Sequence, residues 1–410
     1  MKADFLPIIL GSDENAYGNA RLFAEGYGAK PLLLCMQRLS ASLHSRLFRI
    51  EQIPDFCRPE VFVPYLLDVL HREAQNAEKL LVIPCVDYYS ELLSKYADRF
   101  EGLIANSFLP KPLLDEITGK HRFCELCRTY GLPHPKTLII PSDQRRETEH
   151  CLPDNYPIVL KPENSNASAY LECSFPEKKK VYYIRSRQEY RQIADALDAS
   201  GYPGALVAQE FIPGGEDTLF TVNSYSDANG AVRAMGMGQV LLTEHDPLMR
   251  GNNAAIISRF DESILERLRD FLESIGYVGF ANFDLKLDPR TKTPYVFECN
   301  PRPARTSFYL RAAGLNIMKV FTEDVVYGHR EGCVFADTTA LWRNVPMAVL
   351  KRYVQNRELY REAEALEKAG RCMTSRDCPE DRNLLRSLEM LRYDLALARS
   401  YRRYPPAEKF

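Results

Sequence analysis

The sequence predicts three regions of different architecture: a doubly wound α/β domain, an α+β domain and a helical C-terminal extension. Through about residue 108, short apolar runs alternate with helical patterns, which is typical of a parallel sheet with helices on both faces. From 111 to 328 most patterned segments read as strands with few helices between them, as in an α+β domain. After 328 the chain carries amphipathic, arginine-rich helical patterns. The predicted domains are therefore 1–110, 111–328 and 329–410.

Length and composition fit an ordinary globular protein. A chain of 410 residues is long enough for two or three domains with ample core. The formal net charge of −2 argues against a general nucleic-acid-binding protein. The longest N-terminal apolar run, 5–10, is too short for a signal peptide or a membrane span. We therefore expect a cytoplasmic protein whose 11 cysteines are mostly reduced.

The N-terminal domain is predicted from three strands and the helices between them. Segment 5–10 reads as a buried strand and 11–18 as a turn into a helix, and strand-like runs at 31–35 and 80–84 flank a helical pattern at 61–77. Ligands of such sheets gather at the carboxyl ends of the strands. Four polar residues fall there and are candidates for a substrate pocket: Asp13, Asn15, Tyr17 and Asp87. Each of them can equally be a helix cap or a turn residue.

The second domain is predicted from strands and two helices. Helical patterns cover 119–130 and 187–200, and strands are expected within 133–140, 157–162, 205–212, 219–225 and 231–242. Lys161 stands at the end of an apolar strand, before a small polar loop. Cys124 and Cys127 have CxxC spacing, but no second pair or histidine cluster accompanies them, so we interpret them as core thiols. Within 241–258 a polar loop offers three side chains either to a substrate or to solvent: Arg250, Asn252 and Asn253.

One hairpin, 279–306, carries the clearest chemical signal. Two alternating runs flank a polar turn, which predicts antiparallel strands with Asp284 opposite Glu298 and Asn282 opposite Asn300. Facing carboxylates repel each other, whereas Mg²⁺ takes Asp, Glu and Asn oxygens as ligands beside nucleotide phosphates. The sequence thus predicts a magnesium site, and a hairpin with one wet face is the alternative. The opposite face is expected to enter the core through Phe283, Leu285, Leu287, Tyr295, Phe297 and Cys299.

Four motifs follow one another in a set order: VLKP at 159–162, QEFIPGGED at 209–217, GFANFDLKLDPR at 279–290 and FECNPRPARTSF at 297–308. Together they resemble the nucleotide-binding motifs of the ATP-grasp carboxylate–amine ligases. Within that superfamily the chain is most similar to the bacterial D-aspartate ligases, over roughly residues 5–327. The resemblance implies an ATP-grasp fold and an ADP-forming ligase that uses ATP and Mg²⁺. Such a ligase phosphorylates a carboxylate, and an amine then displaces the phosphate.

The resemblance also implies roles for individual residues. The lysines would contact the phosphates, the hinge 209–212 adenine, and the acidic pair after it the ribose: Lys120, Lys161, Gln209, Glu210, Phe211, Ile212, Glu216 and Asp217. The metal ligands would be Asp284, Glu298 and Asn300, and the groups at the transferring phosphoryl would be Lys161, Arg302 and Arg305. Substrate candidates are Asp13, Tyr17, Asp87, Arg250, Asn252 and Arg311. The ordinary alternatives are solvated lysines and arginines, and a polar turn at the acidic pair.

Two departures leave the donor and the acceptor open. The segment ENSNASA contains no glycine, although many ATP-grasp enzymes cover the phosphates with a glycine-rich loop. The motif NPRPAR looks more like generic ATP-grasp enzymes than like D-aspartate ligases. The leading hypothesis is D-aspartate joined to the lysine side chain of a peptidoglycan precursor. The others are a different amino acid joined to a small amine or peptide, and a nucleotide-binding regulatory protein.

The C-terminal extension is basic, with 16 Lys and Arg against 12 Asp and Glu from residue 329 onward. We expect its helices, within 345–369 and 379–404, to pack against the ATP-binding domain. Attraction of an anionic nucleotide-linked substrate or of a membrane surface is the alternative. No nucleic-acid partner and no integral membrane segment are expected, and a homodimer is one further expectation.

Overall fold

The computed structural model describes residues 2–152, 156–163, 170, 172–176, 178–179, 181–246, 249 and 251–404. Contacts divide the chain into two compact units. Unit 1 comprises Met1–Thr118, Gly214–Leu285 and Glu298–Phe410, and unit 2 comprises Gly119–Pro213 and Lys286–Phe297. The domains predicted from the sequence do not coincide with these units, since the boundaries near 110 and 328 both lie within unit 1. The three-domain division stays a prediction.

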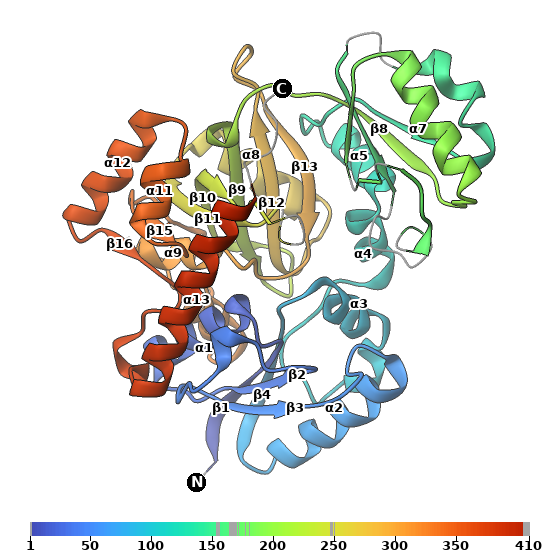
Figure 1. The fold of residues 1–410 in the computed structure, drawn as a ribbon. Coiled ribbons are helices and arrows are strands. Elements are labelled where there is room, and N and C mark those ends of the chain that lie inside the picture. Colours follow the sequence, from blue (N-terminus) through green and yellow to red (C-terminus); the bar gives the residue numbers. More distant parts are fainter. Residues whose placement is uncertain are drawn as a thin grey trace. The chain divides into compact units, whose positions relative to one another are not determined.

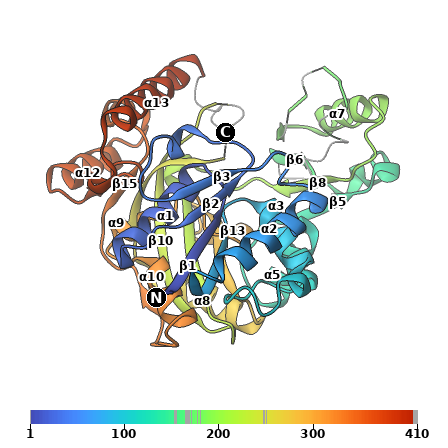
Figure 2. The same ribbon diagram turned by 90° about the horizontal axis from the view of Figure 1, so that it is seen from below.

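Unit 1 begins with a parallel sheet in the strand order β3–β2–β1–β4 (Figures 1 and 2). Its strands are β1 (Ala3–Leu10), β2 (Leu32–Cys35), β3 (Arg49–Gln52) and β4 (Ala77–Pro84). Helix α1 (Glu14–Tyr27) packs on one face of the sheet, and α2 (Pro59–Glu73) and α3 (Asp87–Lys95) pack on the other. The predicted doubly wound arrangement is therefore confirmed. The sequence did not predict β3, because this partly exposed edge strand has no apolar run.

A second, mainly antiparallel sheet forms the centre of unit 1. Among the described residues its strand order is β13–β12–β9–β10–β11–β15–β16, and β14 pairs with β10. The strands are β9 (Leu219–Ser226), β10 (Val232–Thr243), β11 (Asn253–Arg259), β12 (Gly279–Leu287), β13 (Pro294–Asn300), β14 (Val334–Phe335), β15 (Leu341–Arg343) and β16 (Cys372–Met373). The helices that accompany it are α4 (Lys111–Thr118), α8 (Glu262–Ser274), α9 (Phe308–Ala312) and α10 (Ile317–Val325).

Helix α9 lies very close to β10, and glycine makes this approach feasible. A Cβ atom added at Gly236 would lie 2.4 Å from Cδ2 of Leu310 and 2.7 Å from Cβ of Ala336. The hydroxyl of Tyr309 uses the space and donates a hydrogen bond to the Gly236 carbonyl. This close packing holds the start of α9, and with it the preceding NPRPAR segment, against the sheet.

The C-terminal extension continues the central sheet and packs on it. Strand β15 pairs with β11, and helices α11 (Met347–Tyr353) and α12 (Arg357–Lys368) enter one hydrophobic cluster with residues of β10 and β11. The helical region predicted at 345–369 is two helices, because Asn356 caps a new helix by accepting from the amides of Glu358 and Leu359. The last helix is α13 (Leu384–Arg403). No helix among the described residues is both long and apolar enough to cross a membrane.

Unit 2 is a small α+β body with its own core. Its antiparallel sheet has the order β5–β8–β6–β7, formed by β5 (Thr137–Ile140), β6 (Ile158–Pro162), β7 (Tyr182–Ile184) and β8 (Leu206–Glu210). Its helices include α5 (Lys120–Thr129) and α7 (Arg187–Ala199), as predicted within a residue or two. In α5 the Cys127 thiol is buried and the Cys124 thiol lies 3.4 Å from the Thr137 hydroxyl.

Candidate active site

The facing carboxylates of the hairpin lie together at the base of strands β12 and β13. The side chain of Glu298 lies against that of Asp284, and Nδ2 of Asn300 donates to Oδ1 of Asn282 at 3.3 Å. Both contacts agree with the pairing predicted from the alternation. On the opposite face Phe283, Leu285 and Cys299 are buried as expected, whereas Leu287, Tyr295 and Phe297 are only partly buried.

The surroundings of this pair disfavour the negative charge of Asp284. Burial raises the pKa of Asp284 well above its usual range, the charge of Glu298 raises it further, and the charge of Arg302 opposes the rise. A carboxyl group in this condition either binds a proton or binds a cation. A cation bound between the two carboxylates would stabilise the charged form of Asp284, so the pair is a candidate cation site.

The donor atoms suit a hard divalent cation. Asn282 donates from Nδ2 to the Thr221 hydroxyl at 2.7 Å, so its Oδ1 accepts from Asn300, and Oδ1 of Asn300 is the atom of that side chain able to bind a metal. In the part of the chain that the structure describes, no group of three or more His, Cys, Asp and Glu side chains could hold a metal. A third protein ligand beside Asp284 and Glu298 would therefore be the amide oxygen of Asn300, and oxygen sets of this kind fit Mg²⁺.

Arg302 links this pair to the N-terminal sheet. Its Nε lies 2.6 Å from Oδ1 of Asp87. Asp87 is the first residue of α3, the helix that follows strand β4. Burial lowers the pKa of Arg302, but the carboxylate of Asp87 outweighs this effect and raises it. Asp13 caps helix α1 by accepting from the Ala16 amide at 3.1 Å, and the charges of Arg302 and Arg305 both act on it. Asn15 donates to the carbonyls of Cys85 and Pro303, so the NPRPAR segment is fixed to the carboxyl ends of β1 and β4.

Arg305 lies within a buried ionic network. Its Nε donates to Oε2 of Glu14 at 2.6 Å and its Nη2 donates to Oε1 of Glu244 at 3.1 Å. Two residues of the C-terminal extension complete the network: Nδ2 of Asn344 donates to Oε2 of Glu14 at 2.5 Å, and Nε of Arg376 lies 3.0 Å from Oε1 of Glu14. Burial works against the charge of Arg305, but Glu14 and Glu244 raise its pKa above the usual range. Arg305 is thus held by a buried cluster of charged and polar residues that the sequence analysis did not predict.

The residues assigned to adenine and phosphates lie on unit 2. Lys120, the first residue of α5, donates to the carbonyl of Pro162 at 3.1 Å, which brings it to the end of the strand that carries Lys161. In the hinge segment Ile212 is buried, and the Phe211 ring meets Tyr183 edge-on at 6.0 Å between centroids. The other two hinge residues hold the sheet in place, with Gln209 donating to the Thr137 hydroxyl and Glu210 accepting from the Lys136 amide.

The two acidic residues assigned to ribose belong to unit 1 and already have partners. Glu216 accepts from the amide of Thr243 at 2.9 Å and from its hydroxyl. Burial raises the pKa of Glu216, and the bonds from Thr243 oppose the rise. Asp217 accepts from Nδ2 of Asn356 at 2.8 Å. Glu216 therefore keeps one carboxylate oxygen for a ligand, whereas Asp217 ties the hinge turn to α12.

The remaining substrate candidates are scattered through unit 1. Tyr17 is fully buried, and its hydroxyl donates to Asp381 at 2.9 Å, so it connects α1 with the C-terminal extension. Arg311 forms a 2.6 Å ion pair with Glu25 on α1. Asn252 closes its own turn by donating to the Met249 carbonyl. Arg250 lies outside the described residues, as does the predicted phosphate loop 164–168.

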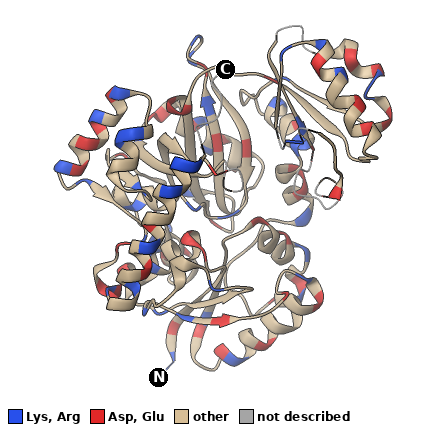
Figure 3. Ribbon diagram, viewed as in Figure 1, with Lys and Arg blue, Asp and Glu red and all other residues tan. Residues whose placement is uncertain are grey.

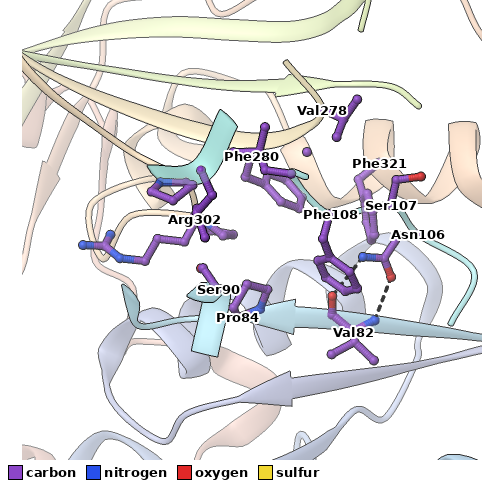
Figure 4. A pocket seen from close by; sticks show the side chains of 15 residues that line it. Val82, Pro84, Ser90, Asn106, Ser107, Phe108, Val278, Phe280, Arg302 and Phe321 are labelled. Carbon is purple, nitrogen blue, oxygen red and sulfur yellow. Dashed lines mark hydrogen bonds between the residues drawn. The ribbon is translucent and has the colours of Figure 1, made fainter. Parts of the chain in front are cut away.

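A small cavity lies behind Arg302 (Figure 4). Phe108, Phe280 and Phe321 line it, and Asn106 closes one side by exchanging two hydrogen bonds with the backbone of Val82. Its volume of about 40 Å³ is enough for a few water molecules but not for an amino acid or a nucleotide. This cavity is therefore packing space beneath the site.

Comparison with known proteins identifies the class. The fold is similar to that of the L-amino acid ligase of Bacillus licheniformis, with a TM-score of 0.55 and 17% identity over 80% of this chain and 75% of that one. It is also similar to the biotin carboxylase domain of the Hydrogenobacter thermophilus 2-oxoglutarate carboxylase in complex with MgADP, with a TM-score of 0.57 and 15% identity over 82% and 73% of the chains. Both are ATP-grasp folds, and this chain has the predicted ATP-grasp fold.

Sequence comparison narrows the class to a family. No family model matches the sequence. The D-aspartate ligase of Enterococcus faecium is 34% identical over 395 residues, which span 94% of this chain and 93% of the relative. The chain therefore belongs to the D-aspartate ligase family and is an ADP-forming, ATP-dependent carboxylate–amine ligase.

Proposed function

We propose that this protein activates the side-chain carboxylate of D-aspartate with ATP and joins it to an amine, the lysine side chain of a peptidoglycan precursor. The observation that carries the proposal is the full-length similarity to a D-aspartate ligase together with the candidate cation site of Asp284, Glu298 and Asn300. The ATP-grasp neighbour in complex with MgADP supports MgATP as the nucleotide. We also propose a cytoplasmic location and a homodimer.

The reaction consists of two displacements. A carboxylate oxygen of the donor attacks the γ-phosphorus of ATP, the β–γ phosphoanhydride bond breaks, and ADP leaves. The acceptor nitrogen then attacks the acyl carbon of the resulting acyl phosphate, inorganic phosphate leaves, and the nitrogen loses a proton. Positioning and charge neutralisation supply most of the acceleration of phosphoryl transfer. When bound at the acidic pair, Mg²⁺ would neutralise phosphate charge.

The residues of this chain divide the work. Lys120 and Lys161 bind the phosphates, and Arg302 stabilises the charge of the transferring group. The backbone of 209–212 binds adenine beside Phe211, and Glu216 accepts from the ribose hydroxyls. Since Asp217 already binds Asn356, we assign the ribose contact to Glu216.

The alternative is an ATP-grasp ligase for a different amino acid, with a small amine or peptide as acceptor. It is favoured by the NPRPAR motif, which looks generic for the superfamily. A regulatory protein without turnover is disfavoured, because a phosphate-binding lysine, an arginine and all three metal ligands are present.

Trapping of the acyl phosphate tests the proposal. The protein is incubated with MgATP, hydroxylamine and each aspartate enantiomer, and the products are compared with hydroxamate standards by mass and chromatography. We expect β-aspartyl hydroxamate from the D-enantiomer, with ADP and phosphate formed in equal amounts. A hydroxamate from another amino acid alone would remove D-aspartate and leave the ligase class intact.

A further inference from the structure

The ionic network around Glu14 contains four buried polar atoms without a hydrogen-bond partner among the described residues. Two of them, Oε1 of Glu14 and Nε of Arg376, form an ion pair at 3.0 Å. The other two are Nη1 of Arg305, a donor, and Oδ1 of Asn344, an acceptor. Both side chains bind the same atom, Oε2 of Glu14, so the two unpartnered atoms belong to one small region. Asn344 is 1% exposed and Glu14 is 2% exposed. Buried polar groups are normally paired, so these atoms have hydrogen-bonding capacity for a polar partner such as a ligand or a water molecule.

The chemistry of the network matches a zwitterion. A free amino acid brings a carboxylate, which accepts hydrogen bonds, and an ammonium group, which donates them. Arg305 and Arg376 offer guanidinium donors, while Asn344, Glu14 and Glu244 offer oxygen acceptors. Two cations and two anions give the network no net charge, so it suits a head group that carries both signs.

The position of the network also suits a donor amino acid. Arg305 lies three residues after Arg302 in the NPRPAR segment, which Asn15 holds by donating to the Pro303 carbonyl at 2.7 Å, so the network and the cation site are joined by one short stretch of chain. On its other side the network borders a cavity of about 420 Å³, lined by Asn344, Arg376 and Asp394, which is large enough for a small ligand.

We propose that this network binds the α-carboxylate and the α-ammonium group of the donor amino acid, with Arg305 and Arg376 on the carboxylate and Asn344 and Glu14 on the ammonium group. The inference rests on the proposed function. It assigns a role to the C-terminal extension, because Asn344 and Arg376 belong to it. It also leaves the donor's side chain as the part that extends toward Arg302.

Calorimetric titration of amino acids into the protein with Mg²⁺ and ADP tests the site without turnover. We expect Asn344→Ala to weaken donor binding by at least about tenfold while the affinity for ADP stays within about twofold. The control is Asn229→Ala, because Asn229 is exposed in the turn between β9 and β10. Thermal unfolding of both variants separates a binding defect from a folding defect.

Each result is decisive. Equal donor binding by Asn344→Ala and wild type would overturn the site, as would a wild type that binds no amino acid at all. If wild type binds a donor, Asn344→Ala loses it and no hydroxamate forms with any amino acid, the binding site stands and the proposed ligase reaction fails.

Helix α13 carries a second feature, a stripe of exposed leucines, of which Leu391 also lines the cavity of about 420 Å³. Five leucines are exposed by about half or more, namely Leu384 (77%), Leu385 (59%), Leu388 (51%), Leu391 (56%) and Leu395 (49%). Four of them, at 384, 388, 391 and 395, follow helical spacing and form one continuous face. An apolar face of this kind on a surface helix marks an interaction surface.

The charged residues beside the stripe indicate what kind of surface it contacts. Four arginines of α13 are exposed: Arg392, Arg399, Arg402 and Arg403. Lys and Arg positions recur along the chain of this helix, as the blue bands in Figure 3 show. The two acids of the helix are only partly exposed and are paired, Glu389 with Arg392 and Asp394 with Arg376. A stripe of about three turns is also short for a stable protein interface, which buries roughly 1,200 Å² or more in total.

We infer that α13 docks on the surface of an anionic lipid bilayer, with its leucines at the acyl boundary and its arginines at the lipid phosphates. Cosedimentation with phosphatidylcholine vesicles, with and without phosphatidylglycerol, measures this binding. We expect binding only to the anionic vesicles, a loss of at least about fivefold in Leu388→Glu/Leu391→Glu, and weakening by salt. The control is Val181→Glu, at an exposed position of unit 2.

Two results would overturn the membrane inference. One is a wild-type protein that does not bind anionic vesicles. The other is a wild-type dimer in light scattering that Leu388→Glu/Leu391→Glu converts to a monomer, which would identify the stripe as an interface between two copies of the chain.

Discussion

Replacing Glu298 with glutamine separates the catalytic role of the acidic pair from its structural cost. The substitution keeps the shape of the side chain and removes one of two facing negative charges. Like charges opposite each other across a ladder cost up to about 1 kcal/mol, and the low end applies here because Glu298 is exposed. Without metal, we therefore expect Glu298→Gln to unfold with a free energy roughly 0.2–0.5 kcal/mol higher than wild type at neutral pH.

The sign of the pH dependence follows from Asp284. Its folded pKa lies above that of an unfolded aspartate, so the folded protein binds the proton more tightly. The stability of the metal-free protein therefore falls as pH rises from about 4 toward the raised pKa. In Glu298→Gln this fall is smaller, because the pKa of Asp284 loses the contribution from Glu298. Urea unfolding in EDTA at several pH values measures both effects.

Although we expect Glu298→Gln to be more stable than wild type without metal, we expect its turnover to be lower. With saturating MgATP we expect Glu298→Gln to lose at least about 100-fold in phosphate release, or about 2.7 kcal/mol in barrier. Glu78→Gln is the matched control, because Glu78 is an exposed glutamate on strand β4. Activity within about tenfold of wild type, a change of only about 1.4 kcal/mol, would refute the metal assignment.

Three further predictions concern other parts of the molecule. Glu216→Ala should raise the KM for ATP by about tenfold with kcat within about threefold, and a fall in kcat alone would move Glu216 away from the ribose. Tyr17→Phe removes a buried hydrogen bond to Asp381 and should lower the free energy of unfolding by about 1–2 kcal/mol, measured by urea titration; no change would show that the bond is compensated. Gly236→Ala should cost about 1–3 kcal/mol through overpacking, whereas Gly332→Ala, where nothing lies within 4 Å of an added Cβ, should cost far less in the same titration.

The hairpin was predictable because its information is local. A period of two fixes which side chains share a face, and the contacts of Glu298 with Asp284 and of Asn300 with Asn282 follow from that period and the position of the turn. Alternation says less about how deeply each side chain is buried. Val296 is buried although it belongs to the face predicted to be wet, so burial at the hairpin tip depends on its surroundings.

The buried network was not predictable because its five members come from five separate places in the chain. Glu14 reads as a turn residue beside the helix cap Asp13, and Glu244 reads as a loop residue. Asn344 directly follows β15, and Arg376 lies in a polar segment after β16. No spacing rule connects them, because only the tertiary fold brings them together. The hydrogen bond of Tyr17 was unpredictable for the same reason, since its partner Asp381 lies 364 residues further along the chain.

The helices of the extension contain a capping signal from which the break between them could have been predicted. The break between α11 and α12 falls at Asn356, a residue type strongly preferred at helix N-caps, and Glu358 follows in the first turn. An amphipathic pattern alone does not reveal such a break, since the apolar spacing continues on both sides. Capping residues inside long amphipathic patterns therefore deserve equal weight with the pattern itself.

The hairpin is also where the chain passes from one unit to the other and back. Strand β12 leaves unit 1 after Leu285, one residue past Asp284, and β13 returns to it at Glu298. Unit 2 is therefore built from two separate stretches of chain, and a fragment covering 119–213 alone lacks the hairpin tip, whose Val296 amide donates to the Pro133 carbonyl at 2.8 Å. Asp284 and Glu298 therefore lie within one residue of the two points at which the hairpin passes between the units. The residues predicted to bind the metal belong to unit 1, although the turn that joins their strands belongs to unit 2.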